Sequence, residues 1–325
     1  MTVPVSFDEA QCRSISSRPF QSCIDAFWSL ISSIHTTSFP PHASSFYVPS
    51  PSEALTPIPG TAPSTHNHWP QSHLHTQWPG SGHPGSPIFS AFYASNVPFL
   101  SSTTLSQTLF QNAGTALLDH IGLSILITHS QGGPSGWLLA DARPKLVRGI
   151  IAIEPAGPPF TNKAIKGVQK PYGIPDQALT YDPPAAEGDT PLQIEIIDET
   201  PPGGGEPWKL QTEPARQLVN LADISVVVVT AEASYHAAYD ECTVRFLKQA
   251  GVMVSWLRLA DQGIRGNGHM MFMEKNNLSI AHLLEKHIAM LLLKNPPPSK
   301  PTNPPHTSSS TPPKIPADLT PPRDT

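Results

Sequence analysis

The stretch Ile125–Trp137, ILITHSQGGPSGW, contains the pattern on which the predicted fold depends. An apolar, β-branched run leads into a polar turn, and small residues then open a helix. This order is typical of a nucleophile elbow, G-x-S-x-G, which holds its serine in a strained backbone conformation. Gly132 and Gly133 supply the small neighbours after Ser130, but Thr128 stands where the first glycine is expected. The pattern alone therefore leaves open whether Ser130 is a nucleophile.

Apolar strands and amphipathic helices alternate around this stretch. The predicted strands are 123–128, 146–154, 224–234 and 252–261, and the predicted helices are 103–122, 133–142, 239–251 and 276–294. Near-continuous apolar strands that alternate with helices indicate an α/β fold with a mostly parallel sheet and helices on both faces. Functional sites in such sheets form at the carboxyl ends of the strands. Ser130, Glu154 and His269 all follow or end predicted strands.

The chain divides into three zones by composition. Residues 1–65 are rich in Ser and Pro and are predicted to be irregular, apart from one apolar island at 23–34 that has the length of a helix. Residues 66–294 form the predicted globular domain, and the Pro-rich tail 295–325 is predicted to be disordered. Inside the domain, 160–222 is a candidate cap or lid. Its candidate pocket walls are Tyr172, Ile174, Leu179, Tyr181 and Trp208.

Composition excludes several classes of protein. The net charge of −5 comes without the basic patch that a nucleic-acid binder needs, and no apolar run reaches the length of a membrane span. Three scattered cysteines indicate neither a disulfide framework nor a zinc site. The histidine-rich stretch 66–83 lacks nearby carboxylates and thiolates, so no metal is expected. No secretory signal is recognised, and a cytoplasmic protein is expected.

A serine nucleophile needs a histidine to take its proton and an acid to orient that histidine. His269 lies between a Gly-rich loop and the last predicted helix, after the last predicted strand. Two acids compete for the third role, because Glu154 and Glu232 each lie at the end of an apolar strand. A carboxylate in such a place is costly unless it is paired, so one of the two has a structural role. Spacing does not rank them.

Three segments, 69–100, 117–160 and 263–277, resemble one branch of the α/β-hydrolase superfamily, the bacterial and fungal serine esterases. The resemblance is carried by the H-S-Q, E-P and G-N-x-H-M motifs together. It implies an α/β-hydrolase fold with Ser130 as nucleophile, Glu154 as acid and His269 as base. It also implies that the backbone N–H of Gln131 donates to the oxyanion hole. Thr128 is compatible with this branch, and Glu232 becomes a structural or site-wall residue.

The function that the resemblance implies is hydrolysis of a carboxylic ester or lactone. The expected substrate is a small, hydrophobic molecule, with no cofactor, no nucleic acid and no membrane as partners, and a role in fungal secondary metabolism is an analogy. The chain departs from the branch upstream, because no His-Gly pair precedes Ser130 to mark the second oxyanion loop. Losing one oxyanion donor costs about 10²–10³ in turnover.

Three rival functions stand beside this one, and the first follows from the missing oxyanion loop. The first is a degenerate, non-catalytic hydrolase-like protein that lacks a complete oxyanion hole. The second keeps the fold but catalyses another reaction, such as hydrolysis of a C–C bond. The third is an interaction module built on the Pro-rich tail.

Overall fold

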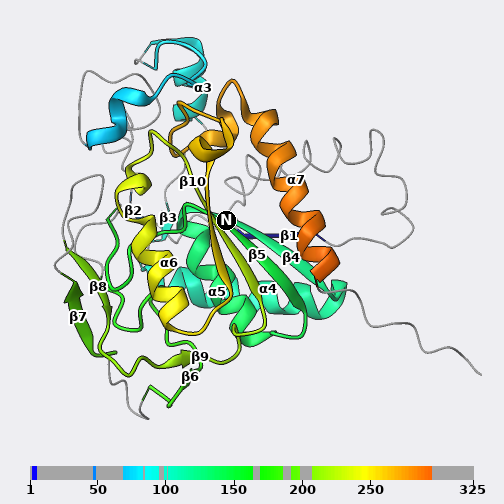
Figure 1. Ribbon diagram of the computed structural model, residues 1–325. Coiled ribbons are helices and arrows are strands. Elements are labelled where there is room, and N and C mark those ends of the chain that lie inside the picture. Colours follow the sequence, from blue (N-terminus) through cyan, green and yellow to red (C-terminus); the bar gives the residue numbers. More distant parts are fainter. Residues whose placement is uncertain are drawn as a thin grey trace, which may run out of the picture.

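The computed structural model describes residues 2–5, 47–48, 69–82, 85–94, 99–100, 102–163, 169–185, 192–197 and 207–294. A five-stranded sheet with the order β1-β4-β5-β10-β11 forms its centre (Figure 1). The strands are β1 (Thr2–Val5), β4 (Ser124–His129), β5 (Val147–Ile153), β10 (Ser225–Thr230) and β11 (Val254–Arg258). The last four run parallel, and β1 pairs antiparallel with β4. This confirms the predicted mostly parallel sheet.

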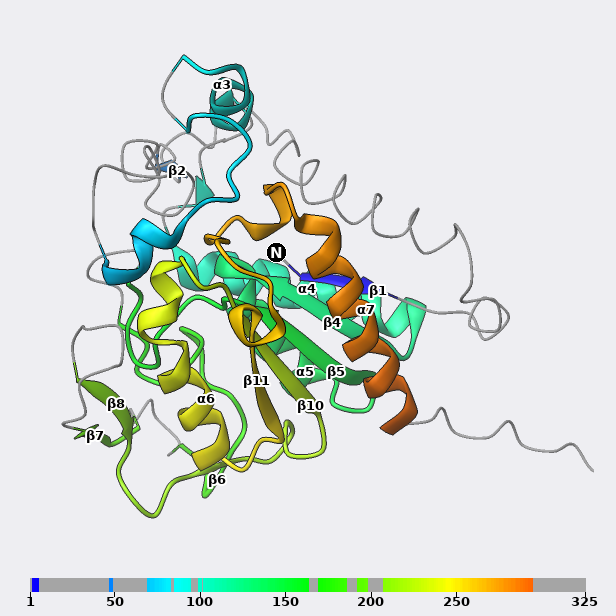
Figure 2. The same ribbon diagram turned by 45° about the horizontal axis from the view of Figure 1, so that its top comes forward.

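Helices cover both faces of the sheet (Figure 2). They are α4 (Thr103–Ile121), α5 (Gly133–Ala142), α6 (Asp240–Gln249) and α7 (Asn277–Lys294), as the sequence predicts. Successive side chains of a strand point to opposite faces. On β5, Ile150 and Ala152 therefore join the apolar cluster under α4, α5 and α6, whereas Ile151 and Ile153 join the cluster under α7. Because both faces are buried, the strands are apolar at nearly every position.

The remaining elements are short. In the part of the chain that the structure describes, they are α3 (Pro87–Ala94), the 3-10 helices η4 (Pro70–Leu74), η5 (Ser130–Gly132), η6 (Tyr235–Ala238), η7 (Leu259–Gln262) and η8 (Met271–Met273), and the strand pairs given below. Within the described ranges, no helix has both the length and the apolar character that crossing a bilayer requires.

The N-terminal zone contains more order than its composition predicts. Besides β1, the strand β2 (Tyr47–Val48) pairs with β3 (Phe99–Leu100). The prediction of an irregular segment was incomplete, because four residues that include Pro4 give too short a pattern to read as a strand. Proline is tolerated at a sheet edge, where β1 lies. The predicted helix at 23–34 and the tail 295–325 lie outside the described residues.

The candidate cap 160–222 contains two small antiparallel pairs, β6 (Tyr181–Asp182) with β9 (Gln217–Leu218) and β7 (Ile194–Ile197) with β8 (Trp208–Gln211). Four of its five candidate pocket walls are buried in the protein, which corrects the prediction. Ile174, Leu179 and Tyr181 belong to the core cluster, and Trp208 lies under the Arg245 guanidinium, 4.3 Å from its ring centroid. Apolar and aromatic side chains suit a core as well as a pocket, so composition could not separate the two. The lid role of 160–222 stays a prediction.

Candidate active site

The turn after β4 holds Ser130 in a left-handed backbone conformation, with φ of 52°. Non-glycine residues adopt this region only when their surroundings impose it. The carbonyl of Ser130 accepts a hydrogen bond of 2.8 Å from the N–H of Ala156 in the turn after β5. Helix α5 packs tightly against that turn, since a Cβ at Gly133 would lie only 2.7 Å from Cα of Pro155. Two neighbouring turns therefore fix the elbow.

Thr128 is accommodated by a glycine on the facing helix. Its side chain is buried under α5, and a Cβ added at Gly136 would lie 2.7 Å from its Cγ2 methyl group. In the usual motif, a glycine in the strand makes room for the helix. Here the glycine is Gly136 in the helix, and it makes room for the Thr128 side chain. This answers how an elbow forms without its first glycine.

Three of the predicted site residues converge. His129 of β4 is in register with Ile153 of β5, so Ser130 and Glu154 follow at the same edge of the sheet. His269 Nε2 lies 2.8 Å from Ser130 Oγ, and His269 Nδ1 lies 2.5 Å from Glu154 Oε2. The loop that carries His269 comes after η7 and brings this histidine to both side chains at the same edge.

Glu154 is fully buried, so its charge depends on the donors around it. It also has a left-handed backbone, with φ of 42°. Its Oε1 accepts the N–H of Ala231 at 2.8 Å, and its Oε2 accepts the hydroxyl of Ser234 at 2.7 Å as well as meeting His269. Charge-assisted hydrogen bonds of this kind compensate a buried carboxylate. Both extra donors come from the residues directly after β10.

Glu232, the alternative acid, lies away from His269. Its Oε1 pairs with Arg265 at 2.5 Å, and its Oε2 accepts the N–H of Gly266 at 2.9 Å. These contacts anchor the start of the loop that carries His269. Gln131, the predicted oxyanion donor, lies in η5 directly after Ser130 with its side chain exposed. The role of its backbone N–H stays a prediction.

Two further histidines flank His269, and sequence reasoning missed both. The ring of His236 stacks on that of His269, with centroids 4.9 Å apart and planes 2° from parallel, and its Nδ1 lies 2.8 Å from Asp240 Oδ1. On another side, the ring centroid of His129 is 4.6 Å from that of His269. Burial holds the pKa of His236 and that of His129 well below the usual histidine value, so both rings are neutral at neutral pH. Neither ring then opposes a positive charge on His269.

A buried hydrogen bond ties the loop of His269 to the segment 69–82. Nε2 of His75 lies 2.7 Å from Oε1 of Glu274, and neither side chain is exposed. Glu274 also accepts hydrogen bonds from the side chain of Asn267 and the N–H of Gly268, immediately before His269. One member of the histidine-rich stretch 66–83 therefore has a structural role.

One group among the described residues has a geometry that a metal ion could use. Ligand atoms of Glu154, His236 and His269 lie within 4.8 Å of one another. Hydrogen bonds to Ser234, Asp240 and Ser130 already engage these three side chains, so an ion would have to displace them. The absence of a metal stays a prediction, which chelation tests.

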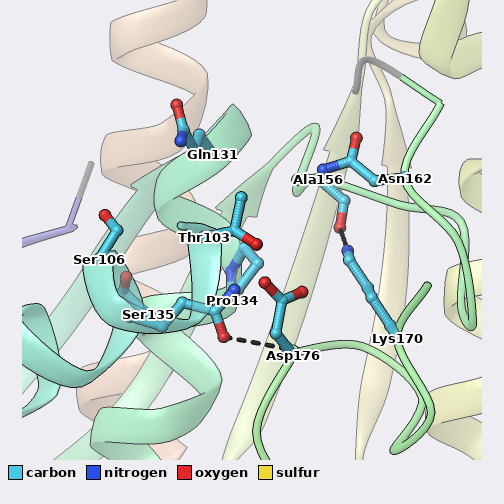
Figure 3. A pocket seen from close by; sticks show the side chains of 10 residues that line it. Thr103, Ser106, Gln131, Pro134, Ser135, Ala156, Asn162, Lys170 and Asp176 are labelled. Carbon is cyan, nitrogen blue, oxygen red and sulfur yellow. Dashed lines mark hydrogen bonds between the residues drawn. The ribbon is translucent and has the colours of Figure 1, made fainter. Parts of the chain in front are cut away.

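A small pocket lies beside the elbow (Figure 3). Its lining residues are Thr103, Ser106, Gln107, Gln131, Pro134, Ser135, Ala156, Asn162, Lys170 and Asp176. Lys170 is buried, and its Nζ donates a hydrogen bond of 2.5 Å to the carbonyl of Ala156. Burial lowers the pKa of Lys170 from 10.5 to about 8. The N–H of Ala156 donates to the carbonyl of Ser130, so the hydrogen bond from Lys170 helps to fix the residue that holds the elbow.

Comparison with known proteins adds a relative and several solved structures. No family model matches the chain. A fungal protein named "Probable secreted lipase phiG" (Fungal sp.) is 50% identical over 222 residues, which are 68% of this chain and 61% of the relative. The chain therefore spans about three fifths of the length of this relative.

Two solved structures are similar at lower identity. A novel bacterial esterase is 20% identical, with 62% of this chain and 48% of that chain covered and a TM-score of 0.39. A carboxylesterase of the thaumarchaeon Nitrososphaera gargenis is 11% identical, with 64% and 85% covered and a TM-score of 0.35.

The parallel sheet, the turn at Ser130 and the identity to the fungal relative define the class of protein. The chain has the α/β-hydrolase fold, and it is similar in sequence to a fungal protein that is named a lipase. The expectation of a cytoplasmic protein is wrong by the same comparison, because the name of the fungal relative describes a secreted protein. That expectation rested only on the lack of a recognisable signal, which is weak evidence.

Proposed function

We propose that the protein is a serine hydrolase that cleaves a carboxylic ester or lactone of a small, hydrophobic molecule. The observation that carries the proposal is the hydrogen-bonded series of Ser130, His269 and Glu154, with distances of 2.8 and 2.5 Å, at the turn after β4. The fungal relative supports it, since that protein is named a lipase. Its name also supports secretion, which we include in the proposal.

In the proposed mechanism, Ser130 Oγ attacks the carbonyl carbon while His269 Nε2 takes its proton. Glu154 holds the imidazole in the tautomer with its proton on Nδ1 and stabilises the imidazolium that forms. The backbone N–H of Gln131 donates to the oxyanion of the tetrahedral intermediate. His269 then gives its proton to the leaving alcohol, and water hydrolyses the acyl-enzyme by the reverse sequence. These steps require no cofactor.

The surroundings of His269 favour an apolar substrate. Met270 and Met273 pack against the buried pair Trp78 and Phe92. The ring of Phe272 meets that of His129 edge-on, with centroids 4.8 Å apart. Met270 and Met273 keep part of their surface exposed near His269, so we propose them as apolar walls of the kind that is typical of sites for hydrophobic ligands. The proposed acyl or alcohol group is therefore hydrophobic.

The test is labelling of the purified protein with a fluorophosphonate probe, with the modified peptide located by mass spectrometry. The probe should label Ser130, and His269→Ala should abolish labelling. Glu154→Gln should slow it by about 10⁴, the loss typical of a triad acid. Glu232→Gln is the matched control for the acid and should label at a rate within a few-fold of the unmodified chain. Chelation with EDTA should change nothing.

Two outcomes would support rivals instead. A folded protein that the probe does not label would be a degenerate, non-catalytic member of the superfamily. A protein that is labelled at Ser130 but turns over none of a panel of esters and lactones would use the same nucleophile for another reaction.

A further inference from the structure

Tyr235 brings a side-chain hydroxyl to the reacting atoms, and the proposed mechanism does not use it. It is the first residue of η6, directly after Ser234. Its hydroxyl lies 3.4 Å from His269 Nε2, which itself lies 2.8 Å from Ser130 Oγ, and it is close enough to Ser130 for that side chain to affect the pKa of the phenol. Tyr235 is half-buried, whereas its neighbours Ser234 and His236 are fully buried. Part of Tyr235 therefore remains exposed, next to two residues that are not.

Aromatic contacts hold the ring of Tyr235 in place. Its centroid lies 4.9 Å from that of His269 and 5.9 Å from that of Trp69, which meets it edge-on. The indole N–H of Trp69 in turn donates a hydrogen bond of 2.9 Å to the carbonyl of Ala233, two residues before Tyr235. The hydroxyl is thus positioned by packing on both sides, as a group that acts on a reacting atom must be.

The position of the hydroxyl identifies which reacting atom it meets. In acyl transfer, Nε2 of the base lies between the serine oxygen and the oxygen of the leaving group, because it passes a proton from one to the other. A group within reach of both Nε2 and Ser130 Oγ is therefore next to the leaving oxygen. The oxyanion is a different atom of the intermediate, and Gln131 is proposed to serve it.

The protonation state of the phenol suits this position. Burial raises the pKa of Tyr235 above its usual value, and the carboxylates of Glu154 and Asp240 act in the same direction. The phenol therefore keeps its proton throughout the neutral range and remains a donor. A neutral donor can stabilise negative charge that develops on a departing alcohol oxygen.

We propose that Tyr235 is a catalytic residue that hydrogen-bonds the leaving-group oxygen; this inference rests on the proposed ester hydrolysis. In acylation the bond from the acyl carbon to Ser130 Oγ forms and the bond to the alcohol oxygen breaks. The serine proton passes through His269 Nε2 to that oxygen, while Tyr235 keeps its own proton. In deacylation the oxygen of the attacking water occupies the position that the alcohol oxygen left, because deacylation repeats the steps of acylation in reverse order.

The experiment compares Tyr235→Phe with the unmodified full-length chain on acetate esters of one acid and different alcohols: p-nitrophenyl, phenyl, trifluoroethyl and ethyl. The quantity measured is kcat/KM, which reports acylation for each ester. The loss in Tyr235→Phe should grow as the alcohol becomes a poorer leaving group, to about 10–100-fold more for ethyl than for p-nitrophenyl acetate, the range for a hydrogen bond to a charged atom. Tyr239→Phe is the matched control, because it removes the hydroxyl of a buried tyrosine whose ring centroid lies 6.1 Å from that of Tyr235, and it should show no such trend.

Three results have distinct meanings. A loss that depends on the leaving group supports the proposal. An equal loss for all four esters, or no loss, overturns it, because a hydroxyl that merely orients Ser130 affects every ester alike. If the fluorophosphonate probe does not label the unmodified chain, the proposed function itself is wrong. If Tyr235→Phe is folded and labelled but loses the same factor in kcat/KM for all four esters, only the proposed role of Tyr235 is wrong.

Discussion

Replacing Gly136 with alanine tests how the elbow accommodates threonine at position 128. The new Cβ would lie 2.7 Å from Cγ2 of Thr128, whereas carbon atoms in contact are about 3.5–4.0 Å apart. Thr128 lies on β4 between β1 and β5, and its β-branched side chain has few alternative rotamers. The overlap therefore has to be relieved by a shift of α5 or of β4, the helix and the strand on either side of the turn at Ser130.

The magnitude follows from two opposing effects. Alanine favours a helix over glycine by about 1 kcal/mol, while an extra methyl group in a packed core costs about 1–3 kcal/mol. The net loss in the free energy of unfolding is therefore about 0–2 kcal/mol, and we expect Gly136→Ala to lower it by about 1 kcal/mol. In a Thr128→Ser background the clashing methyl is gone, and the same change should raise it by up to about 1 kcal/mol. The coupling between the two positions is then about 2 kcal/mol.

The assay is urea unfolding, followed by tryptophan fluorescence, of the unmodified chain, both single variants and the double variant. Gly114→Ala serves as a control, because its Cβ would meet Leu139, 2.7 Å away, and not Thr128. Its effect should be the same with threonine or serine at position 128. If the effect of Gly136→Ala is also the same in both backgrounds, within about 0.5 kcal/mol, our explanation of the elbow is refuted.

Two further predictions concern the buried polar groups around the site. Ser234→Ala removes a donor from the buried carboxylate of Glu154, so the free energy of unfolding in urea should fall by about 1.5–3 kcal/mol, and an unchanged midpoint would contradict this. For Lys170, the native pKa of about 8 lies below the unfolded value of 10.5, so the unfolded chain binds the proton more tightly between these values. The stability of the unmodified chain relative to Lys170→Met should therefore rise with pH from about 8 upward, by at most about 3 kcal/mol, in unfolding titrations at a series of pH values. A difference that does not vary with pH would rule out a depressed pKa for Lys170.

The central sheet could be predicted from the sequence because its strands are buried on both faces. Runs such as Ile125–Thr128 and Val226–Val229 have no polar alternation to obscure them. Strand β1 could not be predicted, since Thr2–Val5 is short and gains its stability only by pairing with β4. The core positions of 160–222 were misread because burial depends on tertiary contacts with α5 and α6.

The site was predictable where a local motif marks it and not where contacts decide it. Ser130 and His269 stand in recognisable turns. Glu154 and Glu232 both follow parallel strands, and geometry separates them only through the hydrogen bonds that each carboxylate makes. Tyr235 had no motif. Its sole signal was its place just after an apolar strand, at the edge of the sheet where functional side chains gather.

The left-handed backbone at Ser130 and at Glu154 has a consequence for how such a protein evolves. Each strained residue lowers stability by about 1–3 kcal/mol, and glycine at either position would relieve the strain while removing the reactive group. Selection for thermal stability alone would thus drift toward inert variants. The site persists only while the reaction itself is under selection, and directed evolution of a hardier version needs an activity screen at every round.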